Sequence, residues 1–238
     1  MRRSQRSSRA PSPIAARFAE RRYGAAMATR LPAGVVRCDD EVLRCFWCAG
    51  DPLYRSYHDR EWGFPVSDDQ RLFEKIALEG FQAGLSWLTI LRKRENFRRA
   101  FHGFAIERVA RMGARDVTRL LGDAGIIRHR GKIESAIHNA KQSLKLIERH
   151  GSLASFVWRF DPPTRERPRR VTKAAVVKLT ETKTSQALSK ALRAESFRFV
   201  GPTTMYAFMQ AMGLVNDHLE ACATRERALA GRAKFRVP

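Results

Sequence analysis

Two cysteine–histidine pairs stand near opposite ends of this chain. Cys45 and His58 come early in the sequence, and His218 and Cys222 come late. Because His218 and Cys222 are four residues apart, we expect them to project from one face of a helix. Two thiolates and two imidazoles are a closed tetrahedral ligand set for zinc. If all four bind one ion, the fold must fasten the two ends of a globular domain together.

The same four residues also have an ordinary interpretation. A single cysteine or histidine more often packs or hydrogen-bonds than binds a metal, and the long interval between the pairs is unlike a compact zinc finger. Cys48 adds another alternative, because Cys45-Phe-Trp-Cys48 has the CxxC spacing of a redox or ligand pair. Four cysteines with this spacing give no disulfide framework, which favours a reducing compartment.

The charge of the chain indicates a polyanionic partner. Its 238 residues include 45 Lys and Arg against 24 Asp and Glu, a net charge of +21. No apolar run approaches the length of a membrane span, and no basic amphipathic surface helix stands out, so we favour nucleic acid over a membrane. A hydrophobic content of 44% is typical of a globular protein.

Composition divides the chain into three parts. We interpret residues 1–40 as a basic, disordered extension, residues 41–222 as the folded domain and residues 223–238 as a basic C-terminal tail. The Arg-rich, Ser-rich start also resembles an organellar transit peptide. We favour disorder, or a start assigned too far upstream with Met27 beginning a shorter product, over targeting.

Hydrophobic periodicity predicts an all-α fold with no internal repeat. Ser67 to Gln70 has the pattern of a capping box, and Gly80 is a plausible end for the helix that follows. Residues 161–171 form a basic, proline-containing loop, and 171–179 is ambiguous between helix and strand. The expected helices span residues 67–80, 84–99, 116–121, 132–149, 152–160, 184–195 and 202–213.

The last two expected helices are joined by a short hairpin. Gly201 permits a tight turn, and Pro202 suits the first position of a helix. The free backbone N–H groups after Pro202 would point out of the helix start, where they can hold a phosphate without reading a base. An ordinary Gly-Pro helix connection is the alternative.

Aromatic residues gather close to the first cysteine–histidine pair. Glu79 follows in the sequence, within the apolar stretch from Ala77 to Trp87. It is either a solvent-facing helix residue or the acid of a pocket whose aromatic walls would hold a cation or a flat heterocycle. The aromatic residues are Trp47, Tyr54, Tyr57, Trp62 and Trp87.

Several motifs together resemble one family, the bacterial 3-methyladenine DNA glycosylase I enzymes of constitutive alkylation repair. The resemblance runs from about Cys45 to Cys222 and leaves both tails outside. The motifs are Asp51-Pro-Leu-Tyr54, Tyr57-His-Asp59, Glu61-Trp-Gly63, Leu78-Glu-Gly80, Gln82-Ala-Gly-Leu-Ser-Trp87, the segment Asp123 to Ile133 and the segment Phe199 to His218.

The resemblance implies a helix-hairpin-helix fold and assigns roles to particular residues. It implies one structural zinc ion per chain, bound by Cys45, His58, His218 and Cys222. The hairpin residues that grip the DNA backbone would be Phe199, Val200, Gly201, Pro202 and Thr203. In the pocket, Glu79 and Tyr57 would contact the damaged base and Trp87 would stack on it, with Trp47 and Trp62 completing the wall.

The implied activity is hydrolysis of the N-glycosidic bond of 3-methyladenine, after the base is flipped out of alkylated double-stranded DNA. Alkylation makes this base a cation and a good leaving group, so recognition matters more than acid catalysis. Glu79 is assigned to recognition and electrostatic stabilisation. We expect a monomer without lyase activity, of the bacterial cytoplasmic type.

Two positions depart from related patterns. Where many helix-hairpin-helix enzymes carry a catalytic Asp, this chain has Asn216 beside Asp217, as expected for the family that it resembles. Phe81 replaces a polar residue before Gln82, which leaves the detailed shape of the pocket open. The competing functions are a zinc-stabilised DNA-binding protein without an active pocket and a zinc hydrolase, which four protein ligands disfavour.

Overall fold

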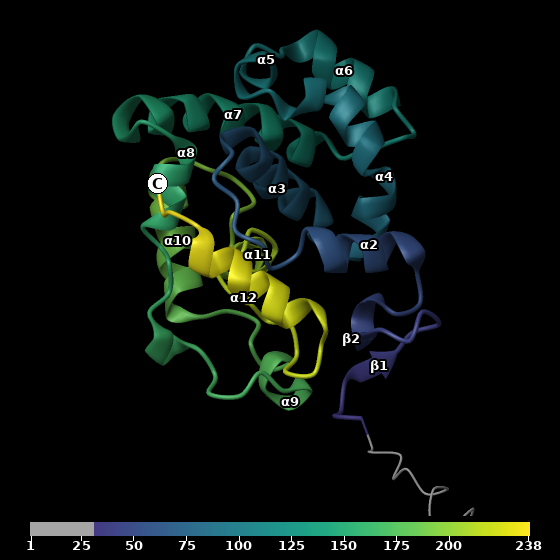
Figure 1. Ribbon diagram of the computed structural model, residues 1–238. Coiled ribbons are helices and arrows are strands. Elements are labelled where there is room, and N and C mark those ends of the chain that lie inside the picture. The colour runs from purple at the N-terminus through teal and green to yellow at the C-terminus, as the bar shows by residue number, and fades with distance from the viewer. Residues whose placement is uncertain (1–30) are drawn as a thin grey trace, which may run out of the picture. The chain divides into compact units, whose positions relative to one another are not determined.

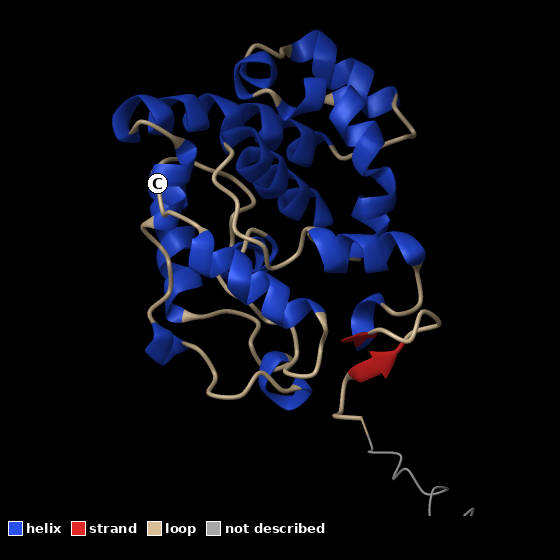
Figure 2. Ribbon diagram, in the orientation of Figure 1, coloured by secondary structure: helices blue, strands red, loops and turns tan. Residues whose placement is uncertain are grey.

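The computed structural model describes residues 31–238, so the predicted disorder of residues 1–30 lies outside it. Helices dominate this range, and the strands in it form one small sheet (Figure 2). Strands β1 (Val35–Arg37) and β2 (Leu43–Cys45) are antiparallel, with Val35 opposite Cys45. The all-helical prediction is therefore confirmed except for this two-stranded sheet, which Figure 1 shows far from α5 and α6.

The predicted α-helices occur in the expected order, with further helices before, between and after them (Figure 1). They are α2 (Pro52–Arg60), α3 (Asp69–Gln82), α4 (Trp87–Ala100), α5 (Ile106–Ala110), α6 (Ala114–Gly122), α7 (Arg130–His150), α8 (Leu153–Trp158), α9 (Lys173–Val176), α10 (Lys183–Ala194), α11 (Pro202–Ala211) and α12 (Thr224–Lys234). Residues 31–238 also contain the 3-10 helices η1 (Phe46–Cys48), η2 (His102–Phe104) and η3 (Thr164–Glu166). The ambiguous segment 171–179 thus contains the short helix α9.

Helix α3 is the centre of the core. It packs against α4, α7, α8 and α11, and every residue from Leu72 to Phe81 is buried. A helix surrounded on all sides must bury its polar positions too, so Glu74, Lys75 and Glu79 are enclosed along with the apolar stripe. The acid of the predicted pocket therefore lies on a helix that is buried on all sides over this stretch.

Two details of α3 differ from the prediction. Its N-cap is Asp68 instead of Ser67, and the Asp68 carboxylate accepts a hydrogen bond from the backbone N–H of Arg71. Gly80 does not end the helix. A Cβ atom at Gly80 would lie 3.2 Å from the Cβ of Phe199, so this glycine allows α3 to approach the hairpin closely.

The folded domain begins earlier than we expected. Strand β1 lies within the segment 1–40 that we assigned to the extension, and Val35 is 7% exposed. Asp40 pairs with the buried guanidinium of Arg44. The compact unit starts at Pro32. The boundary at residue 41 was wrong because three-residue strands carry too little periodicity to be recognised in a sequence.

The segment 223–238 is also part of the domain instead of a tail. Helix α12 buries Ala228 completely, and the ring of Phe235 lies 4.5 Å from that of Trp158. The backbone N–H of Ala223 donates to the carbonyl of Leu43 in β2. Its basic composition suggested a solvated tail, but one small buried face is enough to fold it onto the core.

Helix α11 is followed by a turn that only glycine permits. Gly213 has φ of +73°, and a Cβ atom there would lie 2.3 Å from the backbone of Phe64 and Pro65. The chain then continues to α12 without a helix. This close approach directs residues 214–223 toward the end of the domain that holds α2 and β2, where the two late ligand candidates are needed.

Candidate functional site

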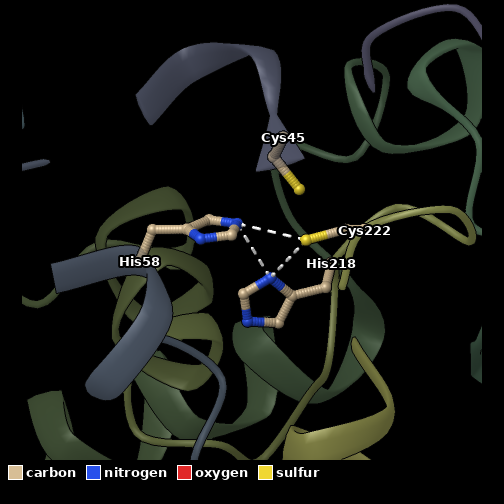
Figure 3. Close-up of side chains that lie close together, drawn as sticks. All are labelled: Cys45, His58, His218 and Cys222. Carbon is tan, nitrogen blue, oxygen red and sulfur yellow. Dashed lines mark hydrogen bonds between the residues drawn. The ribbon is translucent and has the colours of Figure 1, made fainter. Parts of the chain in front are cut away.

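The four predicted ligands meet in one buried cluster. Cys45 ends strand β2, His58 lies on α2, and His218 and Cys222 come from the segment between α11 and α12 (Figure 3). Their ligand atoms all lie within 4.8 Å of one another, and all four residues are buried. His58 Nε2 is 3.1 Å from His218 Nδ1 and 3.5 Å from Cys222 Sγ.

One part of the prediction was wrong. His218 and Cys222 do not share a helical face, because residues 216–222 are a loop with a turn in which the N–H of Cys222 donates to the carbonyl of Leu219. A turn of this kind brings side chains four residues apart to one side, as a helix does. The four-residue spacing therefore predicted correctly that His218 and Cys222 lie together, but it predicted the wrong local structure, a helix.

Neighbouring groups orient both imidazoles toward the cluster. His58 Nδ1 lies 2.7 Å from a carboxylate oxygen of Asp59, and His218 Nε2 lies 2.9 Å from the backbone carbonyl of Trp62. Each of these nitrogens must carry the proton, because its partner is an acceptor. The other two nitrogens are then lone-pair donors that face each other at 3.1 Å, an arrangement that a shared cation stabilises.

The charge of the two thiols supports the same conclusion. A hydrogen bond from Cys45 is the main cause that lowers the pKa of Cys222. The same contact and burial raise the pKa of Cys45. The backbone N–H of Leu219 donates to Cys45 Sγ at 3.4 Å. The cluster therefore concentrates negative charge and lone pairs in a buried place, and it could hold a metal ion.

Cys48 is not part of this cluster. Its thiol donates to the backbone carbonyl of Cys45 at 3.2 Å, and burial is the main cause that raises its pKa to about 12. All four cysteines are free thiols. The CxxC alternative therefore receives no support from the geometry, since Cys48 is oriented toward the backbone and stays protonated.

A cavity of about 280 Å³ opens beside the cluster. The predicted base-contact residues Glu79, Tyr57 and Trp87 all line it, as do Trp47 and Trp62. The space equals roughly nine water molecules at about 30 Å³ each, which suits a flat bicyclic base. The remaining lining residues are Cys45, Phe46, Tyr54, Gln82, Val176, Val177, Ala207, Gln210, Asp217 and Leu219.

The metal-ligand cluster supports the aromatic wall directly. The ring of Trp47 lies 5.1 Å from that of His58, and the ring of Trp62 lies 4.7 Å from that of His218. Trp47 and Trp62 are 5.0 Å apart at a steep angle. Loss of the cluster would thus release two walls of the cavity together with the loop that carries His218.

At the other side of the cavity, Glu79 is 5% exposed and contacts a lysine that we did not single out in the sequence. Lys75 Nζ lies 2.9 Å from Glu79 Oε1, donates to the hydroxyl of Tyr57 at 2.9 Å and stands 3.2 Å from the centroid of a Trp87 ring. Burial is the main cause that raises the pKa of Tyr57, so this hydroxyl stays protonated. In the sequence, the four-residue spacing of Lys75 and Glu79 is the signal that could have indicated this ion pair.

Neither Asn216 nor Asp217 supplies a free carboxylate. Asp217 lines the cavity, but it accepts hydrogen bonds from Tyr206 at 2.6 Å and Gln210 at 2.8 Å and pairs with Arg167. Asn216 caps the loop locally, since its side-chain oxygen accepts from the N–H of His218. Arg167 belongs to the predicted basic loop, so part of that loop stabilises the cavity lining through this ion pair.

The hairpin is held in place from two sides. Asn139 on α7 exchanges two hydrogen bonds of 2.9 Å with the backbone of Arg198, and Ser189 on α10 donates to the carbonyl of Val200 at 2.6 Å. Phe199 is 39% exposed in a left-handed conformation with φ of +56°. Within the predicted hairpin Phe199–Thr203, Phe199 and Thr203 are exposed and Val200 is buried, and the hairpin lies next to Gly80 of α3.

Phe81 and Leu85 lie in environments that the sequence did not predict. Phe81 is 1% exposed and packs on Phe97 and Phe101, so it faces the core and does not line the cavity. Leu85 is 42% exposed in the turn between α3 and α4, where Gly84 has φ of +80°. This exposed leucine stands between Gln82 and Trp87 of the cavity lining, and its exposure could not be read from the sequence.

Comparison with known proteins gives one consistent family. A family model described as methyladenine glycosylase matches residues 47–226. The chain is 52% identical over 181 residues to DNA-3-methyladenine glycosylase 1 of Escherichia coli (strain K12), which covers 75% of this chain and 95% of that protein. It is 47% identical over 190 residues to DNA-3-methyladenine glycosylase of Haemophilus influenzae, covering 76% and 97%.

Solved structures agree with the sequence matches. A crystal structure of 3-methyladenine DNA glycosylase I aligns with a TM-score of 0.70 at 50% identity, covering 76% of this chain and 98% of that one. The Staphylococcus aureus enzyme, described for its structural basis of 3-methyladenine recognition, aligns with a TM-score of 0.69 at 39% identity, covering 74% and 93%. Within residues 31–238 of the present chain, no helix has the length and hydrophobicity to span a membrane.

Proposed function

Because this chain belongs to the methyladenine glycosylase family, we propose that it releases 3-methyladenine from alkylated double-stranded DNA as the first step of base excision repair. The observation that carries this proposal is the placement of Glu79 in an aromatic cavity beside the hairpin. The hairpin supplies affinity for the DNA backbone, and the cavity selects the base.

Selection rests on the charge of the lesion. Methylation at N3 makes the adenine of the nucleotide a cation, which a carboxylate and aromatic faces attract more strongly than they attract neutral adenine. Glu79 and Tyr57 contact the edge of the base, and Trp87 stacks on it, with Trp47 and Trp62 closing the wall. The buried indole N–H of Trp87 has no hydrogen-bond partner in residues 31–238.

The chemistry needs little from an acid. The bond between C1′ and N9 breaks, and its electron pair cancels the positive charge of the departing base. Water adds to C1′ and releases a proton. Glu79 stabilises the positive charge that passes from the base toward C1′ of the sugar as this bond breaks. Asp217 is already neutralised by Arg167, which supports a role in shaping the cavity and argues against a role as general base.

We also propose that the enzyme is monofunctional. A lyase needs an amine nucleophile that reaches C1′ of the sugar. The residues that line the large cavity within 31–238 include no lysine, and Lys75 lies behind the rings of Tyr57 and Trp87. Release of the base without strand cleavage is therefore the expected outcome.

For the buried cluster we propose one structural zinc ion, bound by Cys45, His58, His218 and Cys222. A tetrahedron with zinc–nitrogen and zinc–sulfur bonds of usual length has edges of about 3.3 Å between nitrogens and about 3.5 Å between nitrogen and sulfur. Here the two nitrogens are 3.1 Å apart, and Cys222 Sγ lies 3.5 Å from His58 Nε2 and 3.7 Å from His218 Nδ1. Four protein ligands leave no position for an activated water, so the ion would hold the loop and the aromatic wall in place.

The test is release of methylated base from alkylated duplex DNA, with the metal content of the same preparation measured in parallel. Release of 3-methyladenine with intact strands supports the proposal. Tight DNA binding without release would instead indicate a binding protein. Release of the base accompanied by strand cleavage through a trapped amine–DNA adduct would contradict monofunctional hydrolysis.

A further inference from the structure

A buried lysine, Lys75, lies behind the wall of the cavity and has no part in the proposed reaction. Lys75 lies one helical turn before Glu79 on α3 and is 5% exposed. Its ammonium contacts Glu79, Tyr57 and Trp87, the three residues proposed to hold the base. One buried amine therefore touches the whole recognition set.

Lys75 contacts Glu79, Tyr57 and Trp87 on the side that faces away from the cavity proposed to hold the base. It is absent from the lining of the large cavity, and it lines a small cavity of about 30 Å³ that shares Tyr57 and Trp87 with the large one. The base and Lys75 would thus contact different parts of the same side chains. Lys75 is a candidate for a positioning residue, since it does not reach the reacting atoms.

The neighbouring ion pairs leave Lys75 as the partner of Glu79. Arg94 pairs with Glu61, and Arg98 pairs with Glu74. A buried carboxylate without a counter-charge takes up a proton, because the charged form is poorly solvated. The other titratable or charged groups that line the two cavities around the Lys75–Glu79 pair are Cys45, Tyr54, Tyr57, Glu61, Arg71, Glu74, Arg94, Arg98 and Asp217.

We propose that Lys75 is the resident counter-ion of the base pocket, which keeps the Glu79 carboxylate ionised and oriented before the flipped base arrives. This inference rests on the proposed role of Glu79 in binding a cationic base. Lys75 fixes the carboxylate with one hydrogen bond and the Tyr57 hydroxyl with another. The pocket is then preorganised, and binding a cation requires no proton transfer.

The dependence is mutual. Burial is the main cause that lowers the pKa of Lys75, and the Glu79 carboxylate opposes that shift. Removing Lys75 leaves a buried acid with no cation beside it, which favours the protonated carboxyl in the free protein. A cationic ligand must then displace that proton, so its affinity becomes dependent on pH.

The experiment compares wild type with Lys75→Met by calorimetric titration between pH 6 and pH 8, in two buffers of different ionisation enthalpy. The ligand is 3,9-dimethyladeninium, a permanent cation, and uncharged 3-methyladenine at pH 8 is the reference. We expect no proton release in wild type. In Lys75→Met we expect release of up to one proton per cation bound and an affinity that rises by up to about tenfold per pH unit.

The double variant Lys75→Met/Glu79→Gln is the matched control, because it has no carboxyl to titrate and should release no proton. If Lys75→Met alone is too unstable to purify, recovery of folding in the double variant supports the pairing, and continued instability of the double variant overturns it. Proton release by wild type, or a pH-independent affinity in Lys75→Met, also overturns the proposal. Failure of wild type to bind either ligand would instead refute the proposed base pocket.

Discussion

Nδ1 of His218 lies 3.1 Å from Nε2 of His58, although the two residues are 160 positions apart in the chain. The loop that carries His218 has no regular secondary structure, and it also supplies Asp217 and Leu219 to the cavity. A metal ion at this contact would therefore organise part of the base pocket as well as join the two ends of the domain.

The variant His218→Ala should lose the metal ion and much of the stability. Removal of one ligand from a structural site weakens metal binding strongly, and here metal binding is coupled to folding of the loop. We expect the free energy of unfolding to fall by at least about 3 kcal/mol, or roughly 10 °C in Tm. Elemental analysis and thermal unfolding check this, with Cys48→Ala as a control that keeps the metal. Fully active wild-type protein with almost no metal would contradict it.

Asp59→Asn should weaken metal binding without unfolding the domain. The Asp59 carboxylate orients His58 and pairs with Arg44, and although burial raises its pKa, these two partners lower it overall. The ionised Asp59 carboxylate contributes fully to the stability of the folded domain above the ordinary carboxyl pKa. This contribution is lost as the pH falls from that value through the lowered pKa of Asp59. Competition with a zinc indicator at pH 7 should give a 10- to 100-fold lower affinity. Unchanged affinity would show that Asp59 does not orient the ligand.

Glu79→Gln should reduce release of 3-methyladenine by about 10²-fold or more, while duplex binding stays nearly intact. The amide can still form a hydrogen bond, but it cannot pair with positive charge, so the loss should be largest for the cationic lesion. Quantifying methylated base freed from alkylated DNA checks the prediction. Wild-type rates in this variant would mean that the pocket lies elsewhere.

Asn216→Asp is the companion to Glu79→Gln and should not create strand-cleaving activity. The new carboxylate would stand beside Asp217 of the cavity lining, but no lysine lines the cavity within residues 31–238. Borohydride trapping of a protein–DNA adduct measures this directly. A trapped adduct would disprove the monofunctional assignment.

Truncation should distinguish the N-terminal extension from the folded domain. A chain starting at Pro32 should keep turnover, and its affinity should depend less steeply on salt, because eight arginines and Glu20 are removed. A chain starting at Val42 also loses strand β1 and buried Val35, at a cost of about 2 kcal/mol in stability. Salt titrations of duplex binding and thermal unfolding of both chains check this. Equal stability of the two would show that β1 contributes nothing.

Leu85→Ala should slow base release from duplex DNA more than from single-stranded DNA. A flipped base leaves a gap in the stack, which an apolar side chain at a surface turn can fill, and Leu85 is the exposed leucine beside the cavity. We expect about a tenfold loss on duplex substrate, which corresponds to about 1.4 kcal/mol. Equal losses on the two substrates would argue for a role in the pocket instead of in the duplex.

Much of the fold followed from local patterns. Helices α4, α7, α10 and α11 lie where apolar spacing and capping residues predicted them, since the 3.6-residue period and the caps are properties of neighbouring residues. Strand β1 and helix α12 were missed for the opposite reason. Each is held by contacts with distant residues, such as the pairing of Val35 with Cys45 and the packing of Phe235 on Trp158.

For the site, the sequence determined the chemical types and their grouping: two thiols, two imidazoles, one acid and a set of aromatic rings, with a resemblance that assigned them to one enzyme family. The tertiary structure decided which of them meet and in what environment. It turned the expected helix of His218 and Cys222 into a loop, faced Phe81 into the core and placed Lys75 against Glu79. Burial and counter-charge depend on every element packed around a residue, so the charge state of this pocket could not be read from the chain alone.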